Sequence, residues 1–183
     1  MLRTRLVSAV AVLPTLLLIA FAVLDGRSGV LGLRAAAALE RGDYALATAQ
    51  LARARALSPG NAELWLQTAE LERQRFSLRG EQDARARMFE AYGKAASLSP
   101  FWARPLDDRS QAEALLGDYP AALRSADEAV RRNPNSGGYR ELRAQYLEGM
   151  GRTQEAVAAY RQTLERKSSA SAEAALRRLG ATP

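Results

Sequence analysis

The sequence predicts an all-α protein, a right-handed α-solenoid of about four helical hairpins with a capping helix after it and a single transmembrane helix before it. Two observations lead to this fold. The stretches that begin at Gly42-Asp43-Tyr44 and at Gly117-Asp118-Tyr119 continue with small residues and a closing proline at the same spacings. Ahead of them, residues 6–24 carry no charge. A fixed repeat is typical of stacked supersecondary units, which expose binding surface and seldom catalyse.

The apolar run at residues 6–24 is 19 residues long. A helix of this length spans about 28 Å, close to the roughly 30 Å hydrocarbon core of a bilayer. Arg3 and Arg5 precede the run, so the positive-inside rule predicts that residues 1–5 are cytoplasmic. A cleaved signal peptide is the alternative, because Ala20-Phe21-Ala22 has the small-x-small form of a cleavage site. Both interpretations place the repeats across the membrane, and we expect a single-pass protein of a bacterial inner membrane with a periplasmic repeat domain.

Glycine and proline mark the expected helix ends in the repeat domain, residues 28–167. Three glycines stand where a helix must end in a left-handed conformation, which only glycine adopts without strain: Gly42, Gly117 and Gly151. Three prolines lack a backbone donor and cannot continue a helix, so they separate the hairpins: Pro59, Pro100 and Pro134. Between these breaks, small residues such as Ala122, Ala126 and Ala129 recur at helical spacing, which predicts closely packed helix pairs.

This pattern resembles the tetratricopeptide (TPR) repeat, a helix-turn-helix unit of 34 residues. The third copy has the turn at Gly117 and the closing Pro134, which stands 34 residues after the previous closing proline. In the fourth copy Ser168 replaces the closing proline, so the array is expected to end there. Residues 168–183 then form a capping helix, at 170–179, and a tail, because a terminal repeat needs a polar outer face to stay soluble.

The second copy is longer than the others. Pro59 and Pro100 are 41 residues apart, seven more than the later period. Seven residues are about two helical turns, so one extra turn in each helix keeps the packing register and lengthens the hairpin by about 5 Å near residues 76–82. A loose loop is the alternative, but residues 72–75 and 84–87 are good helix formers without proline. We therefore expect the longer hairpin.

Composition excludes most catalytic chemistry. The chain has no cysteine and no histidine, which excludes disulfides, thiol nucleophiles, imidazole bases and the usual zinc or haem sites. Neighbouring carboxylates such as Asp107-Asp108 point about 100° apart on a helix and cannot face one substrate together. We expect no enzyme activity, no cofactor and no metal. The net charge of +6 is spread along the chain rather than clustered, which predicts no nucleic-acid partner.

The TPR resemblance implies that the first helix of each copy lines a concave groove that holds an extended or helical peptide. Carried over residue by residue, the groove comprises Glu63, Leu66, Glu70, Arg73, Arg104, Asp107, Gln111, Glu141, Gln145 and Glu148. Carboxylates outnumber arginines in this set, although the whole chain is basic. A partner segment with lysine or arginine would be electrostatically matched. The alternative is that these are ordinary solvent-facing residues.

Together these features predict a membrane-anchored TPR scaffold that mediates protein–protein interaction or the assembly of a membrane or envelope complex. Two alternatives stay open. In one, the chain is a structural subunit of a larger membrane complex, held mainly by its transmembrane helix at 6–24, and the groove is empty. In the other, it is an accessory subunit of an envelope biosynthetic enzyme whose catalytic chain is separate.

Overall fold

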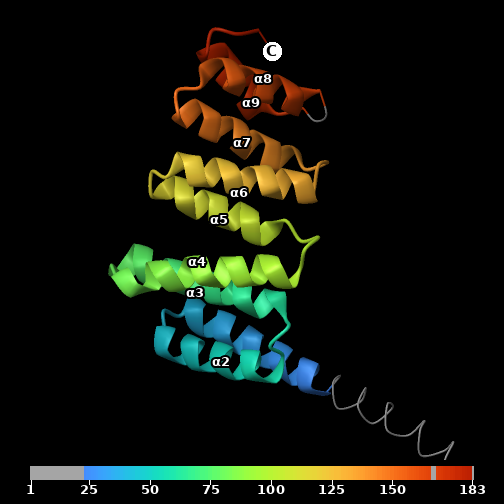
Figure 1. The fold of residues 1–183 in the computed structure, drawn as a ribbon. Helices are drawn as coiled ribbons and strands as arrows, with labels where there is room; N and C mark the ends of the chain where they lie inside the picture. The colour runs from blue at the N-terminus through green and yellow to red at the C-terminus, as the bar shows by residue number, and fades with distance from the viewer. Residues whose placement is uncertain (1–22, 166–167, 183) are drawn as a thin grey trace, which may run out of the picture. The chain divides into compact units, whose positions relative to one another are not determined.

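The computed structural model describes residues 23–165 and 168–182, and every regular element within them is an α-helix (Figure 1). The chain divides into two compact units, Met1–Met88 and Phe89–Pro183. The predicted transmembrane segment lies outside the described residues except for Val23 and Leu24, which begin the first described helix. None of the described helices is both long and apolar enough to cross a bilayer. The all-α prediction is confirmed, and the membrane span stays a prediction.

The first unit consists of a helix at residues 23–40, α2 (Tyr44–Leu57), α3 (Ala62–Arg79) and the start of α4 (Gln82–Leu98) (Figure 1). Its core is built from alanine and leucine: Ala35, Ala38, Ala47, Leu51, Ala54, Leu64 and Leu71. Alanine at a helix contact lets the two backbones approach closely, so the small-residue pattern of the sequence becomes tight packing between neighbouring helices.

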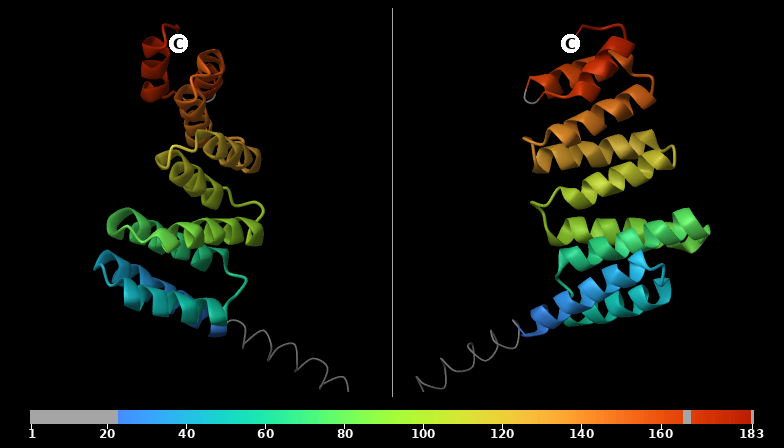
Figure 2. Two further views of the ribbon diagram at one scale, coloured as in Figure 1. Left: turned by 60° about the vertical axis from the view of Figure 1, so that its left-hand side comes forward. Right: turned by 180° about the vertical axis from the view of Figure 1, so that it is seen from behind.

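The second unit continues with α5 (Arg104–Leu115), α6 (Tyr119–Arg132), α7 (Gly137–Gly149), α8 (Thr153–Leu164) and α9 (Ala170–Arg178). Consecutive helices of this unit lie side by side in the views of Figures 1 and 2, as expected for stacked hairpins. The predicted small residues Ala122, Ala126 and Ala129 are at most 1% exposed. α9 packs on α8 and buries Ala172 and Leu176, which confirms the predicted terminal helix to within one residue.

The turns inside three hairpins have the predicted left-handed glycines. The φ angles are 72°, 78° and 71° at Gly42, Gly117 and Gly151. In the first two turns the next residue caps the following helix. The Asp43 carboxylate accepts a hydrogen bond from the N–H of Leu46 at 3.0 Å. Asp118 does the same for the N–H of Ala121 at 3.0 Å. The repeated Gly-Asp pair is therefore a helix stop followed by a helix start.

The second hairpin is extended, as its spacing predicts. α3 has 18 residues and α4 has 17, whereas α5 to α8 have between 12 and 14 each. Gly80, at φ 67°, ends α3, and its N–H donates to the carbonyl oxygen of Phe76 at 3.1 Å. Only Gly80 and Glu81 separate the two helices. The longer hairpin is confirmed, and the loose loop is wrong.

One arginine holds the turn between α4 and α5. Arg132 of α6 donates from Nη1 to the carbonyl oxygens of Ala96, Ser99 and Trp102, at 2.9, 3.2 and 3.3 Å. Its Nε donates to the Glu128 carboxylate at 3.1 Å, and the side chain is only 16% exposed. Carbonyl groups at the end of a helix have no partner within that helix, so a partly buried cationic donor stabilises this turn.

Candidate functional site

The α3 part of the predicted groove is already engaged within the helix. Arg73 and Glu70 form an ion pair with 2.7 Å between Nη2 and Oε1, and the Gln74 amide donates to the same carboxylate. Leu66 is only 4% exposed. It is a core residue, so the prediction that it lines an open groove is wrong. Glu63 is exposed in the first turn of α3, where a carboxylate favourably meets the helix dipole.

On α7, the predicted groove residue Glu141 holds the start of the capping helix. Its carboxylate accepts hydrogen bonds from the hydroxyls of Ser169, at 2.8 Å, and of Ser171. Ser169 is also the N-cap of α9, because its Oγ accepts from the N–H of Ala172 at 3.2 Å. Glu141 therefore fixes α9 through its cap.

The second carboxylate on α7, Glu148, holds the other end of α9. Arg178 donates from Nη2 to both carboxylate oxygens, at 2.7 and 2.9 Å, and the Tyr160 hydroxyl of α8 donates at 2.9 Å. Burial, and next the bond to Glu148, raise the pKa of Tyr160, so the hydroxyl keeps its proton. Glu141 and Glu148 therefore serve the capping helix, which makes the acidic groove smaller than the sequence predicts. The repeat pattern assigns positions within one copy and does not specify what packs on the last copy.

α5 carries the least compensated part of the predicted groove. Asp107 is half-buried and accepts a hydrogen bond from the Gln111 amide at 3.0 Å. Burial, and next the negative charge of Asp108, raise the pKa of Asp107 to about 6. Arg104 pairs with Asp108, with 3.5 Å between Nε and Oδ2, and not with Asp107. Within the part of the chain that the structure describes, Asp107 forms no ion pair.

Tyr139 of α7 packs against a core cluster that includes Leu106 of α5, the residue before Asp107. Burial, and next the charges of Asp107 and Asp108, raise the pKa of Tyr139. A further contact joins the two helices, with 3.2 Å between the hydroxyls of Ser110 and Tyr146. The structure therefore brings together two carboxylates and a phenol from helices α5 and α7. We call Asp107, Asp108 and Tyr139 the acidic patch.

Six of the ten predicted groove positions are at least partly exposed on α5 and α7, and two of these, Glu141 and Glu148, are engaged by the capping helix. The other four are Arg104, Asp107, Gln111 and Gln145. The sequence reasoning missed Asp108 and Tyr139 as parts of the same site. Adjacent helical residues diverge, yet the charge of Asp108 still reaches Asp107. Tyr139 stands two residues into α7 and belongs to no groove position of the repeat pattern. The sequence offered one signal for Tyr139, which is an aromatic residue at the start of the first helix of a repeat.

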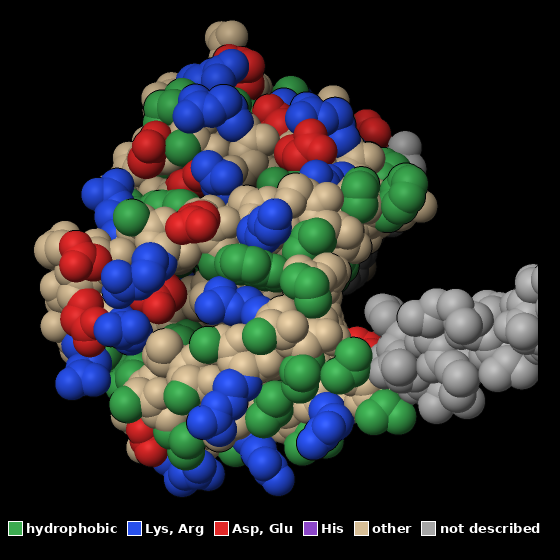
Figure 3. Space-filling model, turned by 60° about the horizontal axis from the view of Figure 1, so that its bottom comes forward, with side chains coloured by type: hydrophobic (Ala, Val, Ile, Leu, Met, Phe, Trp, Pro, Cys, Tyr) green, Lys and Arg blue, Asp and Glu red, His purple; other side chains and the backbone are tan. Residues whose placement is uncertain are grey.

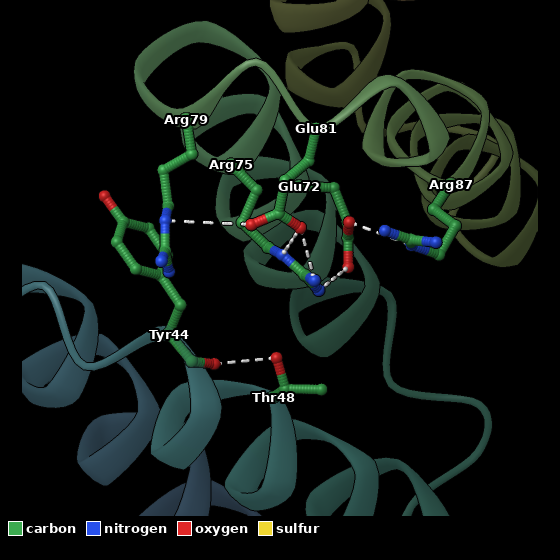
Figure 4. A network of polar contacts seen from close by, with 7 residues as sticks. All are labelled: Tyr44, Thr48, Glu72, Arg75, Arg79, Glu81 and Arg87. Carbon is green, nitrogen blue, oxygen red and sulfur yellow. Dashed lines mark hydrogen bonds and ion pairs between the residues drawn. The ribbon is translucent and has the colours of Figure 1, made fainter.

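A second polar cluster supports the extended hairpin in the first unit (Figure 4). Glu72 of α3 is 4% exposed, and its charge is matched by two arginines. Arg87 of α4 donates from Nε at 2.9 Å, and Arg75 approaches the other oxygen at 3.3 Å. A buried carboxylate that loses its partner is strongly destabilising, so these contacts fix α3 against the start of α4.

The same cluster continues toward the tip of the hairpin and toward α2. Arg75 donates from Nε to Glu81 at 2.8 Å, and this bond raises the pKa of Arg75. Arg79 lies over the ring of Tyr44, with 5.2 Å to its centroid (Figure 4). A small hollow of about 300 Å³ lies between these side chains and Thr48. Because its charges are matched internally, we assign this cluster to the support of the hairpin.

Metal chemistry has no support in the described residues. Within 23–165 and 168–182, no group of three or more acidic, histidine or cysteine side chains is arranged to hold a metal ion. The acidic patch instead offers negative charge and a phenol on adjacent helices, which suits recognition of a cation carried by another molecule.

Comparison with known proteins supports the fold. No family model matches this sequence, and no curated protein matches it. Solved structures are similar. PilF of Pseudomonas aeruginosa has a TM-score of 0.67 and 18% identity, over 85% of this chain and 68% of that one. PilW, a type IV pilus biogenesis factor, has a TM-score of 0.62 and 18% identity, over 84% and 70%. A TPR protein of Thermus thermophilus has a TM-score of 0.61 and 21% identity, over 84% and 79%. At these identities the likeness shows the fold alone, which is of the TPR type.

Proposed function

We propose that this chain is a membrane-anchored scaffold of a bacterial envelope complex, and that its acidic patch binds a basic segment of a protein partner. One observation carries the proposal. Asp107 is half-buried beside a second carboxylate, and its pKa is raised to about 6. Burial and like charge both disfavour the ionised form, whereas an opposite charge within about 4–6 Å favours it. A lysine or arginine of a partner would supply that charge.

The proposal narrows the groove predicted from the sequence. Glu70 pairs within α3, and Glu141 and Glu148 hold α9, so reversing these charges would disturb internal contacts. Asp107 forms no ion pair among the described residues, so it is the central negative charge that a partner can use, and Gln111 donates a hydrogen bond to it. The partner contact is therefore centred on α5 and α7 of the second unit.

Fold and sequence support the location and the class of function. Helical repeats present extended surfaces for partners. The solved structures of this fold include a type IV pilus biogenesis factor, which favours an assembly role. The apolar run at 6–24 supports a single-pass anchor in the inner membrane, with the repeats on the periplasmic side. A structural subunit held mainly by residues 6–24 and an accessory subunit of an envelope biosynthetic enzyme are the alternatives.

The test begins with affinity purification of the full chain from gently solubilised membranes and identification of what is retained. A photo-crosslinking residue at Gln111 should then capture the same partner. The same residue at Glu165, which is exposed at the end of α8, should not. Capture from both positions or from neither would contradict a partner contact at the acidic patch.

Charge variants distinguish the proposed scaffold from the alternative of a structural subunit held mainly by residues 6–24. Asp107→Asn/Asp108→Asn should release the partner, with a loss that shrinks as salt rises, because salt screens exposed charges. The matched control Glu90→Gln/Glu165→Gln removes the same charge from exposed positions and should retain it. Retention of the partner by the patch variant at low salt would refute the proposal. If the partner is instead lost only when residues 1–22 are removed, the chain is the structural subunit.

A further inference from the structure

The first hairpin carries a hollow that the proposed partner site does not use. It has a volume of about 780 Å³ and lies between the helix at 23–40 and α2. Its lining combines apolar side chains with three arginines: Val23, Val30, Leu57, Arg27, Arg34 and Arg53. We call it the N-terminal hollow.

The helix at 23–40 presents this lining as one stripe. Residues 23, 27, 30 and 34 are spaced by four, three and four, so they share a face of the helix. Valine and arginine alternate along it. Val23 is 53% exposed and Val30 is 48% exposed, although valine is a residue that proteins usually bury. Leu33, beside the stripe, is 72% exposed. The first hairpin therefore exposes an apolar face to solvent, and arginine side chains lie on the same face.

The arginines of the hollow are not neutralised by any of the described residues. Among the described residues, Arg27, Arg34 and Arg53 form no ion pair, and no carboxylate lines the hollow. The nearby Asp25 instead accepts a hydrogen bond from Ser58. In Figure 3 hydrophobic and basic side chains gather over the lower part of the view, where few acidic side chains are visible. This face is complementary to a ligand that is both anionic and apolar.

The position of the N-terminal hollow in the chain indicates the class of ligand. Val23 is the first described residue and belongs to the end of the apolar run at 6–24, and it also lines the hollow. A segment that follows a membrane span lies next to the lipid headgroups, where basic side chains are attracted to anionic lipids. Valine and leucine on the same face suit the boundary between headgroups and acyl chains.

We propose that the N-terminal hollow binds an anionic phospholipid of the membrane surface. Arg27, Arg34 and Arg53 hold the phosphate, and the valines meet the upper part of the acyl chains. This proposal rests on the membrane location in the proposed function, and it adds a specific lipid contact to the anchor. Docking of this face would orient the first hairpin on the bilayer.

The test uses the full chain reconstituted in lipid nanodiscs. The sequence has no cysteine, so Val30→Cys places a single environment-sensitive fluorophore in the hollow. In discs of equal phosphatidylcholine and phosphatidylglycerol, a nitroxide on the lipid headgroup should quench this fluorophore strongly. The fluorophore at Leu78→Cys, on an exposed residue of α3, should stay unquenched. In discs of phosphatidylcholine alone, quenching at Val30→Cys should fall.

Arginine variants test the charge. Arg27→Gln/Arg34→Gln should lower the ratio of docked to undocked hollow on the order of 25-fold, from about 1 kcal/mol, or fivefold, for each basic residue near an anionic surface. The control Arg85→Gln/Arg124→Gln removes the same charge from exposed positions that form no ion pair in the described residues, and it should leave quenching unchanged.

Four outcomes overturn the lipid proposal. Two concern the lipid: no quenching at Val30→Cys in anionic discs, or equal quenching in anionic and neutral discs. The third is an equal loss of quenching in both arginine double variants. The fourth is a fluorophore at Val30→Cys that becomes shielded from solvent in detergent as the protein concentration rises, which indicates that a second copy of the chain covers the hollow. Retention of the chain in the discs separately reports the anchor. If the chain is not retained, the membrane part of the proposed function fails. The labelled chain added to vesicles of the same two compositions then decides whether the hollow binds anionic lipid.

Discussion

Replacement of Arg132 by methionine should destabilise the second unit, because one guanidinium serves three carbonyl groups and a carboxylate. Arg132 donates to the carbonyl oxygens of Ala96, Ser99 and Trp102, and to Glu128. Methionine keeps the apolar stem but leaves the carbonyl groups of the turn without this donor. A hydrogen bond to a charged group contributes about 1.5–3 kcal/mol, and an unsatisfied buried acceptor costs a similar amount. The three carbonyl groups share one nitrogen, so we expect a loss of about 2–3 kcal/mol rather than three times that value.

The neighbouring Arg131 provides the matched control. It pairs with the same Glu128 carboxylate, but its side chain is 68% exposed, against 16% for Arg132. Exposed ion pairs contribute about 0–1 kcal/mol, so Arg131→Met should be nearly silent although it removes the same charge. Arg132→Lys should be intermediate, because an ammonium group cannot reproduce the planar set of donors.

Urea unfolding followed by circular dichroism measures these differences in the free energy of unfolding. In thermal unfolding, the midpoint of Arg132→Met should lie about 5–10 °C below that of the parent protein. Equal loss in Arg131→Met and Arg132→Met would mean that the effect is one of net charge. A change below about 0.5 kcal/mol in Arg132→Met would mean that water replaces the guanidinium at the turn. Either result would refute the reasoning.

Three further perturbations test packing and charge. Gly149→Ala would place a Cβ 2.7 Å from the Tyr119 ring, so it should cost about 1–3 kcal/mol in urea unfolding, and the loss should shrink when Tyr119→Ala is combined with it. Ala122 is fully buried, so Ala122→Leu should also cost about 1–3 kcal/mol or more, and an unchanged midpoint would contradict the assigned register. The raised pKa of Asp107 means that the folded state holds this proton more tightly than the unfolded state. Its contribution to stability is therefore present at low pH and is lost as pH rises from about 4 through about 6, and Asp107→Asn should flatten that slope in urea titrations across this range.

The stop and start signals of the hairpins could be predicted because they are local. Gly117 adopts a conformation that other residues enter only with strain, and Asp118 caps the helix that follows within its own turn. The spacing of Pro59 and Pro100 likewise reports how many residues must fit between two helix breaks. These features depend on neighbours in sequence, so the linear pattern was sufficient for them.

The composition of the site could not be predicted in the same way. The repeat pattern placed Leu66 in an open groove, but that side chain is buried. It offered Glu148 to a partner, but Arg178 of the capping helix binds it at 2.7 Å. The pKa of Asp107 is raised first by burial, which depends on the fold, and next by the charge of its sequence neighbour Asp108. Whether a carboxylate is available depends on which helix packs over it.

By itself the sequence determined the all-α repeat, its turns, the extended hairpin and the terminal helix, because backbone conformation and hydrophobic spacing act over a few residues. It also determined the absence of cysteine and histidine chemistry. Only the tertiary structure decided which charges are already matched. Glu72 and Arg87 are 15 residues apart, and Glu148 and Arg178 are 30 apart, yet each pair is in contact. Electrostatic pairing acts through space. The raised pKa of Asp107, and the arginines of the N-terminal hollow that form no ion pair with any described residue, can therefore be identified only once the helices are packed.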